Sequence, residues 1–270
     1  MARLLSILMV ASFFTPASMP APLAGIAHVA FRVSDVAKSR EFYQKLGLEQ
    51  SFAFNDPGKP PVSYIKVNDR QFIELYQQKD ETQPLGLMHV CYEASDIEAL
   101  QKDYVARDVK APEPKKARAG NMLFTIRDPE NQVVEFTQYM PGSLHFEDRG
   151  KHLGEVRGAI HLVAVTMGVQ DIQSERQFYA TKLGFEDSGA QPAIKLRVPG
   201  SSGEELELEQ ANPSLKPRIV LAVGNLQHLA GELRGHGVST EKSGKAISLI
   251  DPDGARIILN PSRETQSRKP

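Results

Sequence analysis

The feature that most constrains this sequence is a strand–helix unit that occurs four times. The first copy, at residues 25–48, begins with alternating residues typical of a β-strand. After a Ser-Asp pair it continues as an amphipathic segment typical of a helix. A second full copy at residues 158–185 repeats the strand histidine and the Phe-Tyr and Leu-Gly pairs of the helix, and shorter copies begin at Gly86 and Arg218. Four copies predict two modules, each made of two repeats.

The segments between the copies complete the pattern of each repeat. Three short strands are expected within residues 50–77, after the first helix, which gives the order β-α-β-β-β. We expect the first module over residues 23–139 and the second over residues 158–261. Residues 140–157 contain Pro, Gly and mixed charge without a period, which is typical of a linker.

The two ends of the chain differ from the rest. Residues 1–21 combine a positive start, a short apolar run and small residues, which is the pattern of a secretory signal peptide. The apolar run is too short to span a bilayer comfortably, so we expect an exported protein with no membrane anchor after processing. Residues 262–270 are polar and charged and are expected to form a disordered tail.

Composition excludes some classes of partner and site. The formal net charge is −1, which gives no strong positive field, so nucleic acid is not an expected partner. Cys91 is the only cysteine, which excludes an intramolecular disulfide and a thiolate metal cluster. We expect it to pack as a small buried residue on a strand.

Four ionisable residues lie on otherwise apolar strands of the first module: His28, Glu74, His89 and Glu135. The histidines occupy the opening strands of the two repeats, and the glutamates occupy the closing strands. When two such repeats face each other, all four side chains converge, and their burial without a cation is costly. Two imidazoles and two carboxylates suit one divalent metal ion, with two coordination positions left over.

Three motifs of the first module resemble the vicinal oxygen chelate superfamily, which includes glyoxalase I, bleomycin- and fosfomycin-resistance proteins, methylmalonyl-CoA epimerase and extradiol dioxygenases. The motifs are Gly-x-x-His-Val-x-Phe-x-Val-x-Asp from Gly25, Phe-Tyr-x-x-Leu-Gly-Leu from Phe42, and Phe-x-x-x-Asp-Pro-x-x-x-x-x-Glu-Phe from Phe124. The resemblance covers residues 25–261. It implies an α+β fold of two tandem modules of paired βαβββ repeats, each pair forming a curled sheet around a cavity.

The resemblance also implies a ligand set for one divalent metal ion, which would be Ni, Zn, Fe(II) or Mn. The residues that match all four ligand positions of the glyoxalase-like members are His28, Glu74, His89 and Glu135. The second module is degenerate. His161 and Glu207 match its first two positions, but Arg218 and Ile258 stand where the other two ligands are expected.

The family pairs its repeats in two ways, and both give four ligands here. Sequential pairing joins His28 and Glu74 to the histidine and glutamate of the second repeat, His89 and Glu135. Exchanged pairing joins the latter two residues to His161 and Glu207 instead. We favour sequential pairing because several two-module members of the family have it. For the oligomeric state, we expect a monomer or a homodimer.

The implied chemistry is that of glyoxalase-like lyases and isomerases, which chelate neighbouring oxygens of a small substrate and move a proton. In this interpretation Glu135 is the base, and Arg32, four residues after His28, binds a substrate carboxylate. A solvated arginine at the strand end is the alternative for Arg32. Lys115, Lys116 and Arg118 form either an anion-binding lid or a solvated loop.

Two other functions remain open. An Fe(II) extradiol-type dioxygenase would use His28, His89 and Glu135 as a two-histidine, one-carboxylate triad. Those enzymes also carry a His and a Tyr shortly before the Asp-Pro turn, where this chain has Thr125 and no histidine. A small-molecule or drug-binding protein without catalysis is the third interpretation, although such a protein need not keep a complete ligand set.

Overall fold

The computed structural model describes residues 23–154, 158–189, 193–212 and 215–262. The predicted signal peptide at residues 1–21 and nearly all of the predicted tail at residues 262–270 lie outside these ranges. Among the described residues, no helix is both long enough and apolar enough to cross a membrane.

The first half of the chain forms one mixed sheet of eight strands in the order β2-β3-β4-β1-β5-β8-β7-β6. Its first repeat comprises β1 (Leu23–Val33), α1 (Val36–Lys45), β2 (Glu49–Phe54), β3 (Val62–Lys66) and β4 (Phe72–Gln77). Its second repeat comprises β5 (Gly86–Ala94), α2 (Ile97–Ala106), β6 (Lys115–Lys116), β7 (Met122–Arg127) and β8 (Val133–Gln138). Both repeats have the predicted β-α-β-β-β order.

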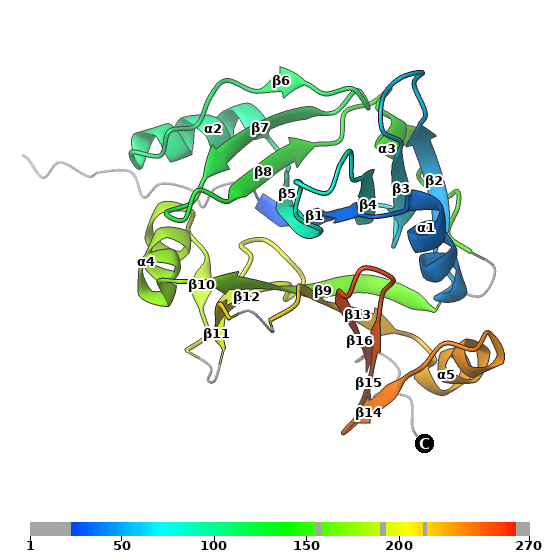
Figure 1. The fold of residues 1–270 in the computed structure, drawn as a ribbon. Helices are drawn as coiled ribbons and strands as arrows, with labels where there is room; N and C mark the ends of the chain where they lie inside the picture. The colour runs from blue at the N-terminus through cyan, green and yellow to red at the C-terminus, as the bar shows by residue number, and fades with distance from the viewer. Residues whose placement is uncertain (1–22, 155–157, 190–192, 213–214, 263–270) are drawn as a thin grey trace, which may run out of the picture.

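The second half repeats this topology in a second sheet of the order β10-β11-β12-β9-β13-β16-β15-β14. Its first repeat comprises β9 (Ala159–Val169), α4 (Ile172–Gln177), the π-helix η1 (Phe178–Lys182), β10 (Glu186–Asp187), β11 (Ile194–Arg197) and β12 (Glu205–Gln210). Its second repeat comprises β13 (Arg218–Val223), α5 (Leu226–Gly235), β14 (Glu241–Ser243), β15 (Ala246–Ile250) and β16 (Arg256–Pro261). The predicted α+β class and tandem organisation are confirmed, and both sheets curl without closing into barrels (Figure 1).

Local sequence signals account for the ends of the first helix. Asp35 accepts hydrogen bonds from the backbone N–H groups of Ala37 and Lys38, so it caps the start of α1. Gly47 follows the helix with a φ of 76°, in the left-handed region that glycine adopts without strain. Tyr43, on the inner face of the helix, is fully buried in the core.

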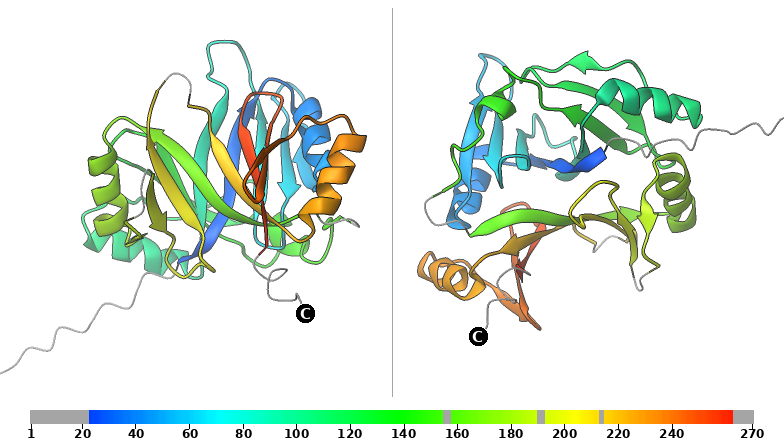
Figure 2. Two further views of the ribbon diagram at one scale, coloured as in Figure 1. Left: turned by 90° about the horizontal axis from the view of Figure 1, so that it is seen from below. Right: turned by 180° about the vertical axis from the view of Figure 1, so that it is seen from behind.

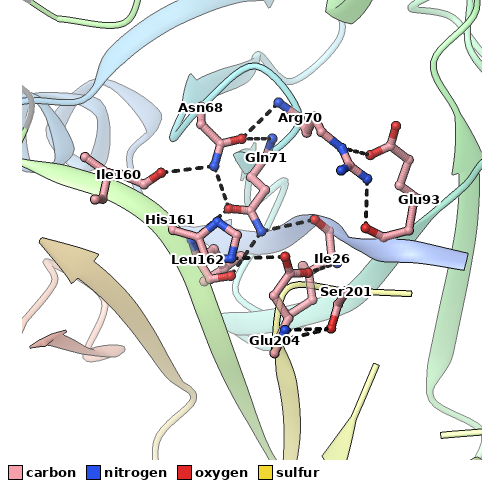
Figure 3. Close-up of polar contacts among 12 residues, drawn as sticks. Ile26, Asn68, Arg70, Gln71, Glu93, Ile160, His161, Leu162, Ser201 and Glu204 are labelled. Carbon is pink, nitrogen blue, oxygen red and sulfur yellow. Dashed lines mark hydrogen bonds and ion pairs between the residues drawn. The ribbon is translucent and has the colours of Figure 1, made fainter. Parts of the chain in front are cut away.

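The two sheets lie back to back, with β1 and β9 running side by side and the outer strands curling away in opposite directions (Figures 1 and 2). Gln71, just before β4, joins them through its side-chain amide. It accepts a hydrogen bond from the N–H of Leu162 at 2.8 Å and donates one to the carbonyl of Leu162 at 3.0 Å. Glu204 holds the corresponding place before β12 and accepts a hydrogen bond from the N–H of Ile26 (Figure 3). Its carboxylate also pairs with His161 at 3.0 Å.

Each module also contributes a turn to the helix start of the other module. In the β7–β8 turn, the Glu130 carboxylate accepts a hydrogen bond from the N–H of Asp171 at 2.7 Å, at the start of α4. In the β15–β16 turn, the Asp253 carboxylate accepts one from the N–H of Ser34 at 3.0 Å, just before α1. These reciprocal contacts supply acceptors to N–H groups that have no partner within their own helix.

The predicted linker contains a helical turn that the sequence analysis did not identify. This helix, α3 (Leu144–Glu147), joins the two edges of the first sheet. The buried ammonium group of Lys66 on β3 lies 2.9 Å from the carboxylate of Asp148 and donates to the carbonyl of Lys151 at 2.8 Å. On the other edge, the N–H of Leu144 donates to the carbonyl of Ala119 at 2.8 Å.

We expect Glu204→Ala to lower the free energy of unfolding by about 1–3 kcal/mol, because it leaves the buried N–H of Ile26 without its acceptor. Urea unfolding would measure this change. The matched control is Glu205→Ala, which removes a neighbouring carboxylate that pairs with Lys195 near the surface and should cost about 1 kcal/mol at most. Equal losses in the two variants would contradict the proposed role of Glu204.

Two buried carboxyl groups, those of Asp128 and Glu175, lie where the β7–β8 turn meets α4. Burial is the main cause of the raised pKa values of Glu175, to about 7, and Asp128, to about 6. The charge of nearby Asp128 raises the pKa of Glu175 further, whereas the hydrogen bond from the N–H of Glu130 opposes this shift. Because the ordinary value is 4.5, the protonated form of Glu175 favours the folded state, and this contribution is lost as the pH rises through about 7.

We therefore expect Glu175→Gln to raise the melting temperature relative to the unaltered protein at about pH 8 and to have little effect at about pH 5. Thermal unfolding followed by circular dichroism at both pH values would test this. Glu98→Gln, at an exposed position on α2, serves as the control and should behave alike at both values. A Glu175→Gln effect that is independent of pH would contradict the assignment.

Candidate metal centre

The four predicted donors meet on one face of the first sheet, each from a different strand. His28 lies on β1, Glu74 on β4, His89 on β5 and Glu135 on β8. These are the four central strands of the sheet, so the structure has the sequential pairing of repeats. His28 and Glu74 are 2 % and 3 % exposed, which makes this a buried polar cluster.

His28 is the centre of the cluster. Its Nε2 lies 3.2 Å from Nε2 of His89 and 3.3 Å from a carboxylate oxygen of Glu135. Its Nδ1 lies 3.4 Å from a carboxylate oxygen of Glu74. The second oxygen of Glu74 accepts a hydrogen bond from the hydroxyl of Tyr76 at 2.8 Å, which fixes the orientation of this carboxylate.

Small residues between the donor positions allow the four side chains to meet. Ala30 lies between Glu74 and His89 in the strand register, and Cys91 lies between His28 and Glu135. The pairing of β1 with β5 is also irregular between Ile26 and His28, just before the first donor. Such bulges redirect neighbouring side chains and often occur beside functional sites.

The pKa values within the cluster reflect burial opposed by mutual attraction. Burial alone would lower the pKa of His28, but the carboxylates of Glu74 and Glu135 outweigh it and raise that pKa. Burial lowers the pKa of His89 to about 4 and raises the pKa of Glu74. For Glu135, burial is opposed by the hydrogen bond and charge of His28, and the pKa is lowered.

These residues fit a divalent metal ion. One ligand atom each from His28, Glu74 and His89 lies within 4.8 Å of the others, and the same holds for His28, Cys91 and Glu135. Nδ1 of His28 is buried and has no hydrogen-bond partner among the described residues. Two buried carboxylates beside two imidazoles carry a desolvation cost that a cation would offset.

Two further side chains of the cluster were not predicted from the sequence. Cys91 is fully buried, as predicted, but its position as a neighbour of two donors depends on the strand register. Tyr76 is the second. Because side chains two residues apart share one face of a strand, its position after Glu74 was a usable signal.

Arg32 and Arg118, two of the other predicted site residues, make their contacts with groups outside the four donors. Arg32 donates to the carbonyl of Pro84 at 3.0 Å and lines a pocket of about 400 Å³ together with Lys216. Its role in binding a substrate stays a prediction. Lys115 and Lys116 are exposed on β6. The guanidinium of Arg118 lies 3.8 Å above the ring of Phe54 at the end of β2 and also pairs with Asp56, so it connects the two edges of the curled sheet.

The predicted match of His161 to the first donor position is wrong. Asp35 and Asp171 cap equivalent helices of the two modules. The strand ends before these helices are also equivalent, because Val33 pairs with Gln77 in the first module and Val169 pairs with Gln210 in the second. Counting back from these anchors, the residue equivalent to His28 is Ala164. His161 lies three residues earlier and pairs with Glu204 instead. The Gly-x-x-His match misled the alignment because β9 contains three additional residues between that histidine and the helix.

The second module replaces the donor cluster with an ion-pair network. Glu207 occupies the place of Glu74, but Lys195 lies 2.9 Å from one of its carboxylate oxygens and Arg218 lies 2.8 Å from the other. Thr166, at the place of Ala30, donates to Glu207 at 2.8 Å. Side-chain cations of the protein therefore neutralise the carboxylate that remains.

The sequence comparison agrees with the motifs. Residues 25–136 match the family described as Glyoxalase/Bleomycin resistance protein/Dioxygenase superfamily. The resemblance inferred from the sequence is therefore confirmed over the first module. No curated protein sequence matches the chain.

Solved structures share the fold over nearly the whole chain. A variant of homoprotocatechuate 2,3-dioxygenase from B. fuscum in complex with HPCA has a TM-score of 0.68 at 18 % identity, over 91 % of this chain and 73 % of that one. The same enzyme from Arthrobacter globiformis has a TM-score of 0.65 at 19 % identity, over 93 % and 84 %. The Mn(II)-bound glyoxalase from Novosphingobium aromaticivorans has a TM-score of 0.67 at 16 % identity, over 90 % and 84 %. At these identities the likeness concerns the fold alone.

We expect His89→Ala and Glu135→Ala to abolish stoichiometric metal binding, because each removes a donor of the cluster. Elemental analysis after dialysis against Zn²⁺ or Mn²⁺ would measure the bound metal. His161→Ala is the matched control and should keep its metal, because His161 belongs to the contact between modules. Full metal content in His89→Ala would refute the site.

Proposed function

We propose that this protein is a metal-dependent enzyme of the glyoxalase type, a lyase or isomerase that acts on a small oxygenated substrate. One divalent ion, Ni, Zn, Fe(II) or Mn, would be held by His28, Glu74, His89 and Glu135. The observation that carries the proposal is the convergence of these four donors, with contacts of 3.2–3.4 Å around His28. An octahedral ion held by these four donors would keep two positions for substrate oxygens.

The bound metal would act as a Lewis acid that stabilises negative charge on the substrate oxygens. The two carboxylates would have different roles. The side chain of Glu135 is 13 % exposed, whereas that of Glu74 is 4 % exposed and fixed by Tyr76. Glu135 is therefore the better placed to take a proton from substrate carbon, and its lowered pKa keeps it ionised at neutral pH.

A specific observation also favours a second candidate, an Fe(II) extradiol-type dioxygenase. The two nitrogens of His28 face different partners, because Nε2 lies near His89 and Glu135 while Nδ1 lies near Glu74. In that arrangement Glu74 would orient His28 from the outer sphere rather than bind the metal. The remaining three donors form a two-histidine, one-carboxylate triad.

The role of Glu74 and the reaction itself distinguish the two candidates. For the isomerase, we expect Glu74→Gln to lose most of its metal. We also expect the metal-loaded protein to exchange deuterium for the proton on the carbon beside a carbonyl. Proton NMR of an α-hydroxycarbonyl panel in D₂O would detect this exchange, and Glu135→Gln should abolish it. Glu98→Gln serves as the control at an exposed site.

Retained metal in Glu74→Gln, together with O₂ uptake on addition of a catechol, would overturn the isomerase in favour of the dioxygenase. A protein that takes up no metal would overturn both and favour a binding protein without catalysis. We further propose that the enzyme is exported, on the pattern of residues 1–21, which makes the mainly cytosolic thiol glutathione a poor candidate cosubstrate.

A further inference from the structure

A third histidine lies close to the donor cluster without belonging to it. His145, on α3, is 2 % exposed. Its ring stacks on Tyr139 at a centroid distance of 4.5 Å and meets Phe72 edge-on at 4.9 Å and Phe52 at 5.0 Å. Neither ring nitrogen has a hydrogen-bond partner among the described residues.

Folding alone does not account for a histidine at this position. Each buried polar atom without a partner lowers the stability of the folded state, and a phenylalanine of similar shape would avoid that cost. The surroundings are aromatic and would accommodate such a ring. Burial keeps the imidazole neutral, because it lowers the pKa of His145 to about 3. A neutral imidazole has one donor and one acceptor available for a ligand.

The neighbours of His145 connect it to the donor cluster. Phe72, which touches the ring, is the cross-strand neighbour of His28. Tyr139, which stacks on the ring, directly follows the strand that carries Glu135.

The helix that carries His145 is held firmly in place. Lys66 fixes the C-terminal end of α3 through Asp148, and the carbonyl of Ala119 fixes its N-terminal end. The imidazole is therefore kept on the inner face of the curled sheet, beside the rings of Phe52 and Tyr64, which stack at 4.2 Å.

We propose that His145 hydrogen-bonds the small molecule chelated at the metal centre, and that the aromatic side chains around it select planar, conjugated molecules among the possible ligands. This inference rests on the proposed metal site and deepens it, because it names the class of ligand. His145 is thus a positioning and specificity residue that comes from the segment between the modules.

The test uses 4-nitrocatechol, a planar vicinal diol whose absorbance changes on chelation, titrated into the metal-loaded full chain. His145→Phe should weaken binding of this probe about tenfold or more, because the probe loses its partner in the aromatic surroundings. Metal content should be unchanged, and the melting temperature should be equal or higher. His145→Gln, which keeps a hydrogen-bonding side chain, should recover part of the affinity. His228→Gln, at an exposed position on α5, is the remote control.

The outcomes separate this inference from the proposed function. Metal uptake with equal probe affinity in His145→Phe and the unaltered protein would overturn the inference alone. Metal uptake without any probe binding by the unaltered protein would also overturn it while leaving the metal site intact. Failure of the unaltered protein to take up metal would overturn both. A loss of probe affinity in His145→Phe, with metal content and folding preserved, is the expected result.

Discussion

The burial of opposed charges on the inner face of the first sheet is the constraint on which the rest of this structure depends. His28 and Glu74 are almost inaccessible to water, and their neighbours supply only partial compensation. The strand order makes this possible, because it places β4, β1, β5 and β8 side by side and needs only Ala30 and Cys91 between the donors. A sheet that carries such a cluster has a strong electrostatic reason to bind a cation.

The second sheet shows how the same architecture behaves once the donors are replaced. Glu207 persists at its place, but Arg218 and Lys195 balance its charge from within the chain. A guanidinium and an ammonium group satisfy the carboxylate permanently, so this half needs no external ion. The two halves thus have the same backbone topology but differ in how the charge of a buried carboxylate is balanced. In the second half side-chain cations balance it, whereas in the first half the carboxylates lie beside imidazoles.

The sequence was sufficient for features that depend on local pattern and insufficient for those that depend on register or on distant contacts. The donors of the first module could be predicted because each occupies a fixed place in a repeated strand. His161 could not be placed correctly, because a glycine match competed with the helix cap at Asp171 and the two differ by three residues. His145 gave no signal, since its segment has no period and its aromatic neighbours come from strands distant in the chain. Hydrogen bonds between the modules, such as those of Gln71, could not be predicted from the sequence either, because they join residues that are distant in the chain.

The reciprocal turns explain why a half without a donor cluster remains indispensable. Asp253 of the second half completes the start of α1, and Glu130 of the first half completes the start of α4. Loss of either half would therefore leave helix ends and the back of β1 exposed in the survivor. A module without a donor cluster can still be required for the stability of the fold. Here the second module supplies contacts that the first module, which carries the donors, needs to fold.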